Sequence, residues 1–363
     1  MKLLILGDLF PKTIKQYPRF EGYDFRMANL ECAISDDDKP IVKDGPSLKI
    51  PSERINILKE LKLDLVGLAN NHVLDYGISG LNNTIKILEE NNINYSGCTY
   101  CKNYFIKRIQ NMNVAFYFVS EHQYNFFEDS GVGVNVLEEK TFCEIEELKK
   151  EVDFLIVLFH GGRELFRYPT PLLEKNCHRF VDCGASIVVC QHSHCVGCSE
   201  KYKDATIIYG QGNFIFPFSN VEHYKTGVSI EVDINDDGNY KIKYLPTVHL
   251  EDNVVRFANP QEAETILKGF NERTDNLANK GVDYIYDVFV QEKGMDFLYH
   301  LFNKSKFYIR LDTSRYFNGK LMKRYLKKNQ RYLTYLYNYF NCETHVEFIK
   351  ATLKKQIKDK DSE

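Results

Sequence analysis

The sequence predicts an α/β fold built around a sheet that is covered on both faces. Over the first 250 of the 363 residues, short apolar runs alternate with helical patterns, which is typical of proteins with a mixed or parallel sheet. Most of these runs are continuously apolar rather than alternating, as expected for strands that are buried on both faces. Both observations point to strands sandwiched between layers of helices.

The apolar runs give the order of the predicted strands. They cover residues 2–6, 25–30, 64–69, 114–119, 154–159, 186–190 and 206–209. Leu81, Ile85 and Leu88 form an apolar stripe that indicates a helix after the third strand. A later helix has clear end signals, because Thr170 and Pro171 suit its N-cap and first position, and Gly184 lies just past its end.

The composition changes near residue 260. Residues 1–250 carry 27 basic and 34 acidic side chains, a net charge of −7, whereas residues 251–363 carry 20 and 16, a net charge of +4. Stretches such as 261–273 and 320–340 have helical patterns rich in Lys, Tyr, Leu and Phe. We therefore predict two domains, an α/β domain at residues 1–255 and a helical domain at residues 256–363.

The overall composition excludes several classes of protein. With 44% hydrophobic residues, 27% charged residues and a net charge of −3, the chain is neither disordered, nor collagen-like, nor a polycation that coats nucleic acid. The apolar run near its start covers only residues 3–6, too short for a signal peptide or a membrane span. The ten cysteines are scattered, which suits a reducing compartment. We expect a cytoplasmic protein without a transmembrane segment.

Polar residues follow five of the predicted strands at their carboxyl ends. In chain order they are Asp8; Asn29 and Glu31; Asn70, Asn71 and His72; His160; and His192 with His194. In an open α/β sheet these ends share one edge, and ligands bind in the crevice outside it. The sequence therefore predicts that these groups converge.

Such a convergence needs a cation, because each unpaired buried ion costs several kcal/mol. No Lys or Arg lies within residues 70–72 or 190–194, so a metal is the simplest source of positive charge. Imidazole, carboxylate and amide ligands favour Zn, Mn or Fe. Six candidate ligands exceed the three that one catalytic zinc takes from protein, which favours two ions.

Each group taken alone has a simpler interpretation. Asp8 suits a turn after a strand, Asn70 and Asn71 suit the start of a turn, and a single His160 suits a hydrogen-bonded core histidine. His192 and His194 face opposite ways in an extended chain. Both can serve one site only if the backbone turns there.

Six segments carry a resemblance to a known family. They are Gly7-Asp8, Asn29-Leu30-Glu31, residues 68–77, residues 160–164 with 169–171, His192-Ser193-His194, and residues 209–214. In order and spacing they resemble the motifs of the CapA-type capsule (poly-gamma-glutamate) synthesis proteins, a branch of the calcineurin-like metallophosphoesterases. The resemblance covers roughly residues 1–235. It implies a four-layered α/β/β/α core with a two-metal site at one edge of the paired sheets, followed here by a C-terminal helical appendage.

The resemblance also implies the metal ligands. Asp8 and His194 would bind the first ion, and Glu31 would bridge the two ions. The second ion would be held by Asn71, His160 and His192.

The resemblance also assigns the residues that would act on or contact the substrate. The resemblance implies that His72 faces the substrate oxygen and protonates the leaving group, oriented by Asp75. Arg163 and Glu164 would clamp the substrate. Asn70 and Asn213 are also predicted to bind the substrate. Asn213 would in addition support the site through a hydrogen bond.

The sequence departs from the wider superfamily at three positions. Phe10 stands where a histidine is expected, so the first ion has fewer protein ligands. Glu31 replaces the usual bridging aspartate, as in the CapA branch. Gln191 occupies a position that is usually glycine.

These features predict metal-assisted hydrolysis of a phosphoester or an amide in a surface polymer or its precursor. Two alternatives stay open. In the first alternative, the protein is not an enzyme but a metal-containing assembly or polymer-binding factor for capsule synthesis. Separately, the pairs Cys98/Cys101 and Cys195/Cys198 have the spacing of a four-thiolate structural zinc site.

A basic segment lies in the C-terminal part. Residues 304–331 hold ten basic side chains and one acidic side chain, Asp312. The segment suits either a solvated helical face or a surface for an anionic polymer or a membrane, with nucleic acid the least favoured partner. The sequence does not predict an oligomeric state.

Overall fold

A computed structural model describes residues 1–43, 45–127, 129–302, 328 and 330–360. By their contacts the residues form two compact units, each described here by itself. The first comprises residues 1–41 and 47–282, and the second comprises residues 42–46 and 283–363. The predicted domain boundary between residues 255 and 256 stays a prediction.

The first unit contains two large sheets. In the first sheet the order of strands is β18 (Val254–Phe257), β17 (Tyr240–Leu250), β16 (Thr226–Ile234), β1 (Lys2–Leu9), β2 (Phe25–Leu30), β5 (Leu65–Gly67) and β6 (Asn94–Ser96), and β15 (Asn213–Ile215) also pairs with β1. In the second sheet it is β13 (Ser199–Tyr202), β14 (Ala205–Ile208), β12 (Ile187–Gln191), β11 (Phe154–His160), β8 (Met112–Ser120) and β7 (Tyr104–Ile109). Two small two-stranded sheets complete the unit: β3 (Ala33–Ile34) with β4 (Lys49–Ile50), and β9 (Phe126–Phe127) with β10 (Val132–Gly133).

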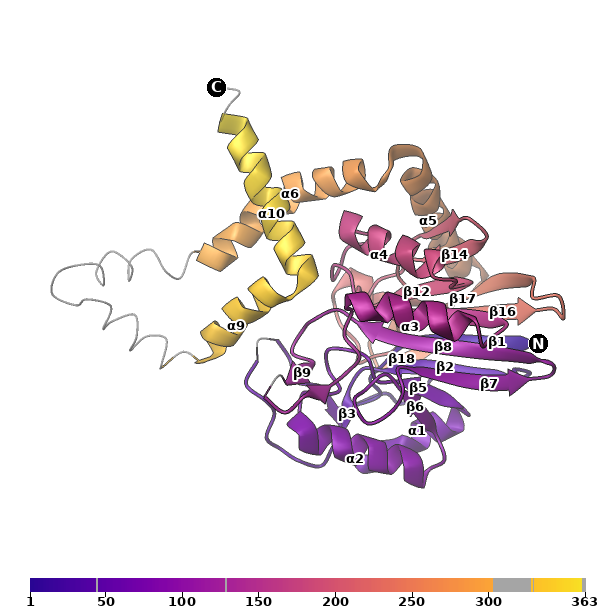
Figure 1. Cartoon of the computed structure of the whole chain (residues 1–363). Coiled ribbons are helices and arrows are strands. Elements are labelled where there is room, and N and C mark those ends of the chain that lie inside the picture. The colour runs from indigo at the N-terminus through magenta and orange to yellow at the C-terminus, as the bar shows by residue number, and fades with distance from the viewer. Residues whose placement is uncertain (44, 128, 303–327, 329, 361–363) are drawn as a thin grey trace. The chain divides into compact units, whose positions relative to one another are not determined.

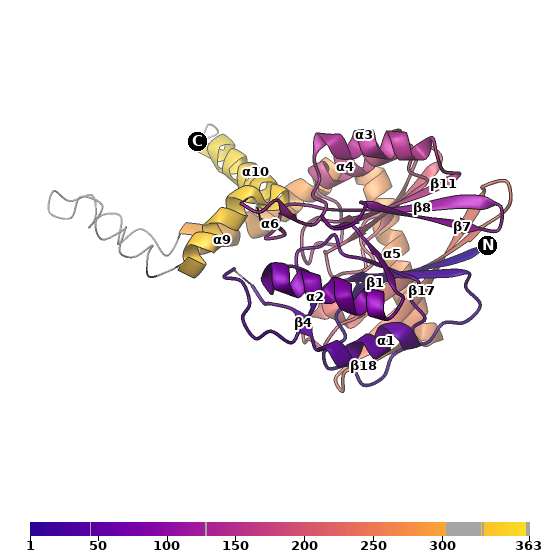
Figure 2. The same cartoon turned by 60° about the horizontal axis from the view of Figure 1, so that its bottom comes forward.

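Helices cover the outer face of each large sheet (Figure 1). The helices α1 (Ile55–Glu60) and α2 (Gly77–Glu90) lie against the first sheet, and α3 (Glu139–Lys149) and α4 (Pro171–Asp182) against the second. Figure 2 shows the resulting layers in the order helices, sheet, sheet, helices. The predicted four-layered α/β/β/α core is therefore confirmed.

The two sheets pack through aromatic side chains. Phe116 of β8 stacks on Phe25 of β2 with ring centroids 5.0 Å apart and an interplanar angle of 24°, and both rings are buried. Nearby, the ring of Phe118 lies directly on the backbone of Gly67 in β5, where an added Cβ would come within 2.6 Å of Phe118 Cδ1. This contact brings the sheets close together at the end of β5.

The Gly67 contact leads to a stability prediction. Gly67→Ala is expected to lower the free energy of unfolding by about 1–3 kcal/mol, because the methyl group overpacks the interface between the sheets. The measurement is urea unfolding. Gly269→Ala is the matched control, since Gly269 lies inside helix α5 (Pro260–Lys280) and a Cβ there meets only the end of the flexible Arg273 side chain. The control is expected to be neutral or stabilising, and an equal loss in both variants would contradict the prediction.

All the predicted strands are present, and their ends agree within two residues except that β1 runs three residues further, to Leu9. Parallel pairing joins β1, β2, β5 and β6 in one sheet and β8, β11, β12 and β14 in the other. The strands β16 and β17 were not predicted. They form an antiparallel ribbon in which outward-facing residues such as Asp233 and Lys241 interrupt the apolar pattern.

The helix ends follow the predicted signals. The Thr170 hydroxyl accepts a hydrogen bond from the Leu173 N–H at 3.2 Å, and Gly184 has φ = +109° just past the helix. In α5, Asn259 and Glu262 form a reciprocal capping box. Helix α5 packs against β13 and β17, with Phe270 against Tyr244 at a centroid distance of 4.7 Å.

The second unit is helical. It is built from α6 (Val282–Phe302), α9 (Gln330–Asn341) and α10 (Glu343–Lys360), and Phe348 of α10 packs on Phe289 of α6 at 5.3 Å between ring centroids. Of the predicted basic segment 304–331, only residues 328, 330 and 331 belong to the described residues. Within the described chain, none of the helices combines the length and apolar character needed to cross a bilayer.

Candidate metal centre

The carboxyl ends of the parallel strands bring the predicted site residues together. Asp8, Asn29 and His160 are the last or next-to-last residues of β1, β2 and β11. The other predicted ligands follow shortly after the ends of β2, β5 and β12. They are Glu31, Asn71, His192 and His194. All the predicted ligands are buried, and the structure brings them close together around Glu31 and His160. Their role as metal ligands stays a prediction.

One cluster is formed by Asp8, Glu31 and His194, whose candidate ligand atoms all lie within 4.8 Å of one another. His194 Nδ1 is 3.7 Å from Asp8 Oδ2, and His194 Nε2 is 3.7 Å from Glu31 Oε1. These separations exceed the length of a hydrogen bond. The separation between His194 Nε2 and Glu31 Oε1 roughly matches the 3–4 Å between two atoms that bind one ion at about 2.1 Å each.

A second cluster shares the same glutamate. Glu31, His160 and His192 again offer ligand atoms within 4.8 Å of one another. His160 Nε2 lies 3.5 Å from Glu31 Oε1 and 3.0 Å from Asn71 Oδ1. Glu31 thus stands between two groups of donors, at the position of a bridging ligand.

The state of Glu31 tests whether a cation fits this edge. Its side chain is fully buried, and neither carboxylate oxygen has a hydrogen-bond partner among the described residues. Burial, reinforced by the nearby charge of Asp8, raises the pKa of Glu31 well above its usual range. A buried carboxylate without donors is costly, and a divalent cation would offset this cost. The residues therefore fit a divalent metal.

The two histidines that face Glu31 differ in their electrostatics. Burial lowers the pKa of His160 to about 4, so its ring is neutral and suited to binding a metal. For His194, burial also acts to lower the pKa, but the charges of Glu31 and Asp8 outweigh it and raise the pKa above its usual value. Glu31 and Asp8 therefore favour positive charge at the position of His194.

The backbone turns at both residues of the His192–His194 pair. His192 has φ = +83° and His194 has φ = +54°, a region that non-glycine residues rarely adopt. The turn allows both imidazoles to reach the cluster. Such strain is common at functional sites.

Two asparagines hold the ligands in place. Asn29 Nδ2 donates to Asp8 Oδ1 at 2.8 Å and lies 3.1 Å from His160 Nδ1. Asn70 donates to Asn29 Oδ1 and to the Leu30 carbonyl, while its own Oδ1 accepts from the His72 and Val73 N–H groups. The Asn70 side chain is thus engaged by the protein, and a direct substrate contact from it stays a prediction.

Asn213 supports the other half of the centre. It is fully buried on β15, and its Oδ1 lies 2.9 Å from His194 Nδ1. This agrees with the predicted supporting hydrogen bond and leaves His194 Nε2 to face Glu31. A substrate contact from Asn213 stays a prediction.

His72 and Asp75 form a tight pair beside the cluster. His72 Nδ1 is 2.7 Å from Asp75 Oδ2, which also accepts a hydrogen bond from the Leu48 N–H at 2.6 Å. Both side chains are buried. The spacing i, i+3 thus gives the oriented imidazole that the sequence predicts.

Aromatic side chains surround the first cluster where a further histidine is expected. Phe10 packs edge-on against Phe216, and Tyr224 stacks on the His194 ring with centroids 4.9 Å apart. Neither Phe10 nor Phe216 offers a ligand atom. Among the described His, Cys, Asp and Glu side chains, the first cluster consists of Asp8, Glu31 and His194, and the smaller number of ligands to its ion stays a prediction.

The predicted substrate clamp has one member near the cluster. Glu164 Oε1 lies 3.9 Å from His192 Nε2, and its side chain is 47% exposed. Arg163 is half-buried in the same loop. The role of Arg163 stays a prediction.

The prediction missed Glu121. This residue is 4% exposed and follows β8 at the same edge, with Oε1 3.5 Å from His192 Nε2. A signal was present, because the predicted strand 114–119 ends two residues earlier. The sequence prediction names no polar residue after this strand.

The four-thiolate alternative is wrong. The groups of three or more His, Cys, Asp or Glu side chains that could hold a metal in the described part of the chain contain no cysteine. Cys98 follows β6 of the first sheet, whereas Cys198 precedes β13 of the second. The two pairs therefore do not form one site.

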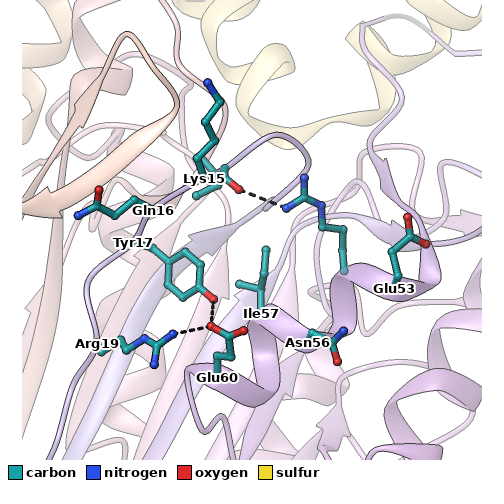
Figure 3. Close-up of a pocket in the computed structure, with 10 residues that line it drawn as sticks. Lys15, Gln16, Tyr17, Arg19, Glu53, Asn56, Ile57 and Glu60 are labelled. Carbon is teal, nitrogen blue, oxygen red and sulfur yellow. Dashed lines mark hydrogen bonds and ion pairs between the residues drawn. The ribbon is translucent and has the colours of Figure 1, made fainter.

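Two other polar features lie outside the cluster. Glu174, His178 and Glu200 approach one another, but His178 Nε2 is already paired with Glu200 at 3.0 Å. A surface hollow of about 690 Å³ has Lys15, Arg19 and Glu60 among its lining residues, which are drawn in Figure 3. There Glu60 accepts hydrogen bonds from Arg19 and from the Tyr17 hydroxyl.

Comparison with known proteins identifies a family whose model matches this chain. The family model described as bacterial capsule synthesis protein PGA_cap matches residues 11–217. The match includes every predicted site residue except Asp8.

Two curated relatives match more than half of the chain. The capsule biosynthesis protein CapA of Bacillus anthracis is 26% identical over 243 residues, which are 63% of this chain and 59% of that protein. The PGA biosynthesis protein CapA of Bacillus subtilis (strain 168) is 27% identical over 220 residues, 56% of this chain and 57% of that protein. The chain therefore spans less than two thirds of the length of these relatives.

Among solved structures, one described as a novel phosphatase from Mycoplasma pneumoniae aligns with 73% of this chain and 96% of its own, at 12% identity and a TM-score of 0.43.

Proposed function

The chain belongs to the bacterial capsule synthesis protein family PGA_cap, and we propose that it is a metal-dependent hydrolase that cleaves a phosphoester or amide bond in a precursor of a surface polymer. The observation that carries the proposal is the position of Glu31. This buried carboxylate lies between two groups of His and Asp donors and has no hydrogen-bond donor of its own in the described chain. It has the environment of a ligand shared by two cations.

The ligand types fit two divalent ions of the Mn, Zn or Fe class. When bound, the ions supply an activated water nucleophile and positive charge opposite the reacting oxygen. Asp8 and His194 would hold one ion, Asn71, His160 and His192 would hold the other, and Glu31 would join them. Because the first group has only three donors, we expect its ion to exchange more readily.

The residues beside the cluster would handle the substrate. His72 is oriented by Asp75 through Nδ1, and the doubly protonated ring would carry on Nε2 the proton that a leaving oxygen needs. Glu164 and Arg163 occupy the loop next to His192, where they would contact the substrate. The phosphoester is favoured over the amide by the superfamily, and the cytoplasmic location stays a prediction.

The proposal is tested on the whole chain with Mn²⁺. Isothermal titration calorimetry is expected to show two binding events of different affinity, and Mn²⁺-loaded protein is expected to hydrolyse aryl phosphate monoesters or diesters. His160→Ala is expected to lower turnover by roughly 100-fold or more through loss of a ligand. His178→Ala, which removes a half-buried histidine outside the cluster, is the matched control and is expected to leave binding and turnover unchanged.

Two outcomes would count against the proposal. Absence of Mn²⁺ and Zn²⁺ binding by the wild-type chain would remove its basis. Bound metal without turnover of phosphomonoesters, phosphodiesters or glutamyl amides would instead support the alternative, an assembly or polymer-binding factor that uses the metal for structure or recognition.

A further inference from the structure

Glu121 is a buried carboxylate at the metal-binding edge that none of the roles above uses. It directly follows β8, and its N–H donates to the His160 carbonyl at 3.1 Å. This backbone bond ties Glu121 to the end of β11. Its side chain is only 4% exposed, so its position is set by the fold rather than by solvent.

The carboxylate of Glu121 faces one particular nitrogen of His192. Glu121 Oε1 lies 3.5 Å from His192 Nε2, and Glu164 Oε1 lies 3.9 Å from the same atom. Two carboxylates therefore favour a proton on Nε2. A neutral imidazole that is protonated at Nε2 has its lone pair on Nδ1.

The neighbouring histidine shows the same division of its two nitrogens. His194 Nδ1 lies 2.9 Å from Asn213 Oδ1, and its Nε2 is directed toward Glu31. One ring nitrogen is held by the protein and the other faces the cluster. At His192 the two nitrogens exchange roles, which the turn in the backbone between the residues permits.

We propose that Glu121 is a positioning residue that closes its 3.5 Å separation from His192 and accepts the Nε2–H when the ion binds, so that Nδ1 of His192 faces the ion held with Glu31 and His160. The inference rests on the proposed function, because it assigns a partner to one of the proposed ligands. Carboxylates that accept from a metal-binding histidine fix its tautomer and raise its basicity. Glu121 would therefore set the affinity of the second ion without touching it.

A series of substitutions tests the assignment. Glu121→Ala removes the acceptor, whereas Glu121→Gln keeps a carbonyl acceptor but loses the charge. Titration with Mn²⁺ is expected to show a loss of affinity at the tighter event of roughly 10–100-fold for Glu121→Ala and a smaller loss for Glu121→Gln. The weaker event is expected to change little. Unfolding of the metal-free protein shows whether either variant has simply lost its fold.

The control is Glu144→Gln. Glu144 lies on α3, where it accepts hydrogen bonds from Tyr117 and Asn103, and it is not part of the cluster. This variant also loses a carboxylate that accepts from protein groups. It is expected to keep wild-type Mn²⁺ affinity at both events.

A second measurement reports on the nitrogens themselves. In Zn²⁺-loaded protein labelled with ¹⁵N-histidine, long-range ¹H–¹⁵N correlations are expected to show His192 bound to metal through Nδ1 and protonated at Nε2. Metal on Nε2, or equal loss of affinity in Glu121→Gln and Glu121→Ala, would overturn the assignment and make Glu121 a direct ligand. Unchanged affinity in Glu121→Ala would also overturn it. If the wild-type chain binds no metal at all, it is the proposed function that fails.

Discussion

Glu31→Gln is expected to abolish metal binding at both clusters while leaving the metal-free protein at least as stable as wild type. Glu31 is the one residue shared by the two clusters, so its loss removes a ligand from each. The affinity for Mn²⁺ is expected to fall by roughly 100-fold or more, since even residues outside the ligand set change affinity by 10–100-fold. Hydrolysis is expected to fall with it.

The stability part of this prediction follows from the surroundings of Glu31. In the metal-free protein the carboxylate is buried close to Asp8, and no described group donates a hydrogen bond to it. A neutral amide of nearly the same shape removes the repulsion and the desolvation of a charge. The metal-free variant is expected to gain about 1–3 kcal/mol in free energy of unfolding, measured by urea unfolding in excess chelator.

The Glu144→Gln variant separates this effect from the general loss of a carboxylate. Glu144 has two donors, Asn103 and Tyr117, so its amide variant is expected to be less stable by about 1–2 kcal/mol and to retain both ions. Opposite signs of stability change in the two variants would support the interpretation of Glu31. A Glu31→Gln variant that is clearly less stable than wild type without metal would contradict it.

Much of the metal centre could be predicted because it follows from one geometric rule. Asp8, Glu31, His160 and His192 lie far apart in the sequence, but each comes at or just after the carboxyl end of a continuously apolar strand. Parallel strands place these ends at one edge. The residue types at the edge then indicate the class of ion that they would bind.

The parts that could not be predicted depend on contacts between distant elements. The two paired sheets were predicted only through the family resemblance. Their packing requires Phe116 to meet Phe25 and Phe118 to meet Gly67, and strand patterns alone do not specify which faces meet. The ribbon of β16 and β17 has polar residues on its open face, so its apolar pattern is incomplete. Asn29 was predicted near the site, but its role in holding Asp8 and His160 together depends on side-chain directions.

His72→Ala is expected to slow hydrolysis in proportion to how much the leaving group needs a proton. Asp75 fixes the His72 ring through Nδ1 at 2.7 Å, and in the proposed mechanism Nε2 of the protonated ring faces the substrate. General acid catalysis of this kind contributes roughly 10²–10⁴-fold. We expect a loss of that size with alkyl phosphates and a much smaller loss with p-nitrophenyl phosphate, whose leaving group departs without a proton. The measurement is the slope of log kcat against leaving-group pKa, which is expected to become steeper in the variant.

Metal content and a second variant decide between proton donation and a structural role for His72. His72 belongs to neither cluster, so His72→Ala is expected to retain both ions. Asp75→Asn is expected to steepen the same slope to a smaller extent and also to lower stability, because Asp75 accepts a hydrogen bond from the Leu48 N–H. An equal loss with every leaving group would show that His72 does not donate the proton. A loss of bound metal in His72→Ala would show that the residue supports the cluster instead. The slower hydrolysis would then come from missing ions and not from a missing proton donor.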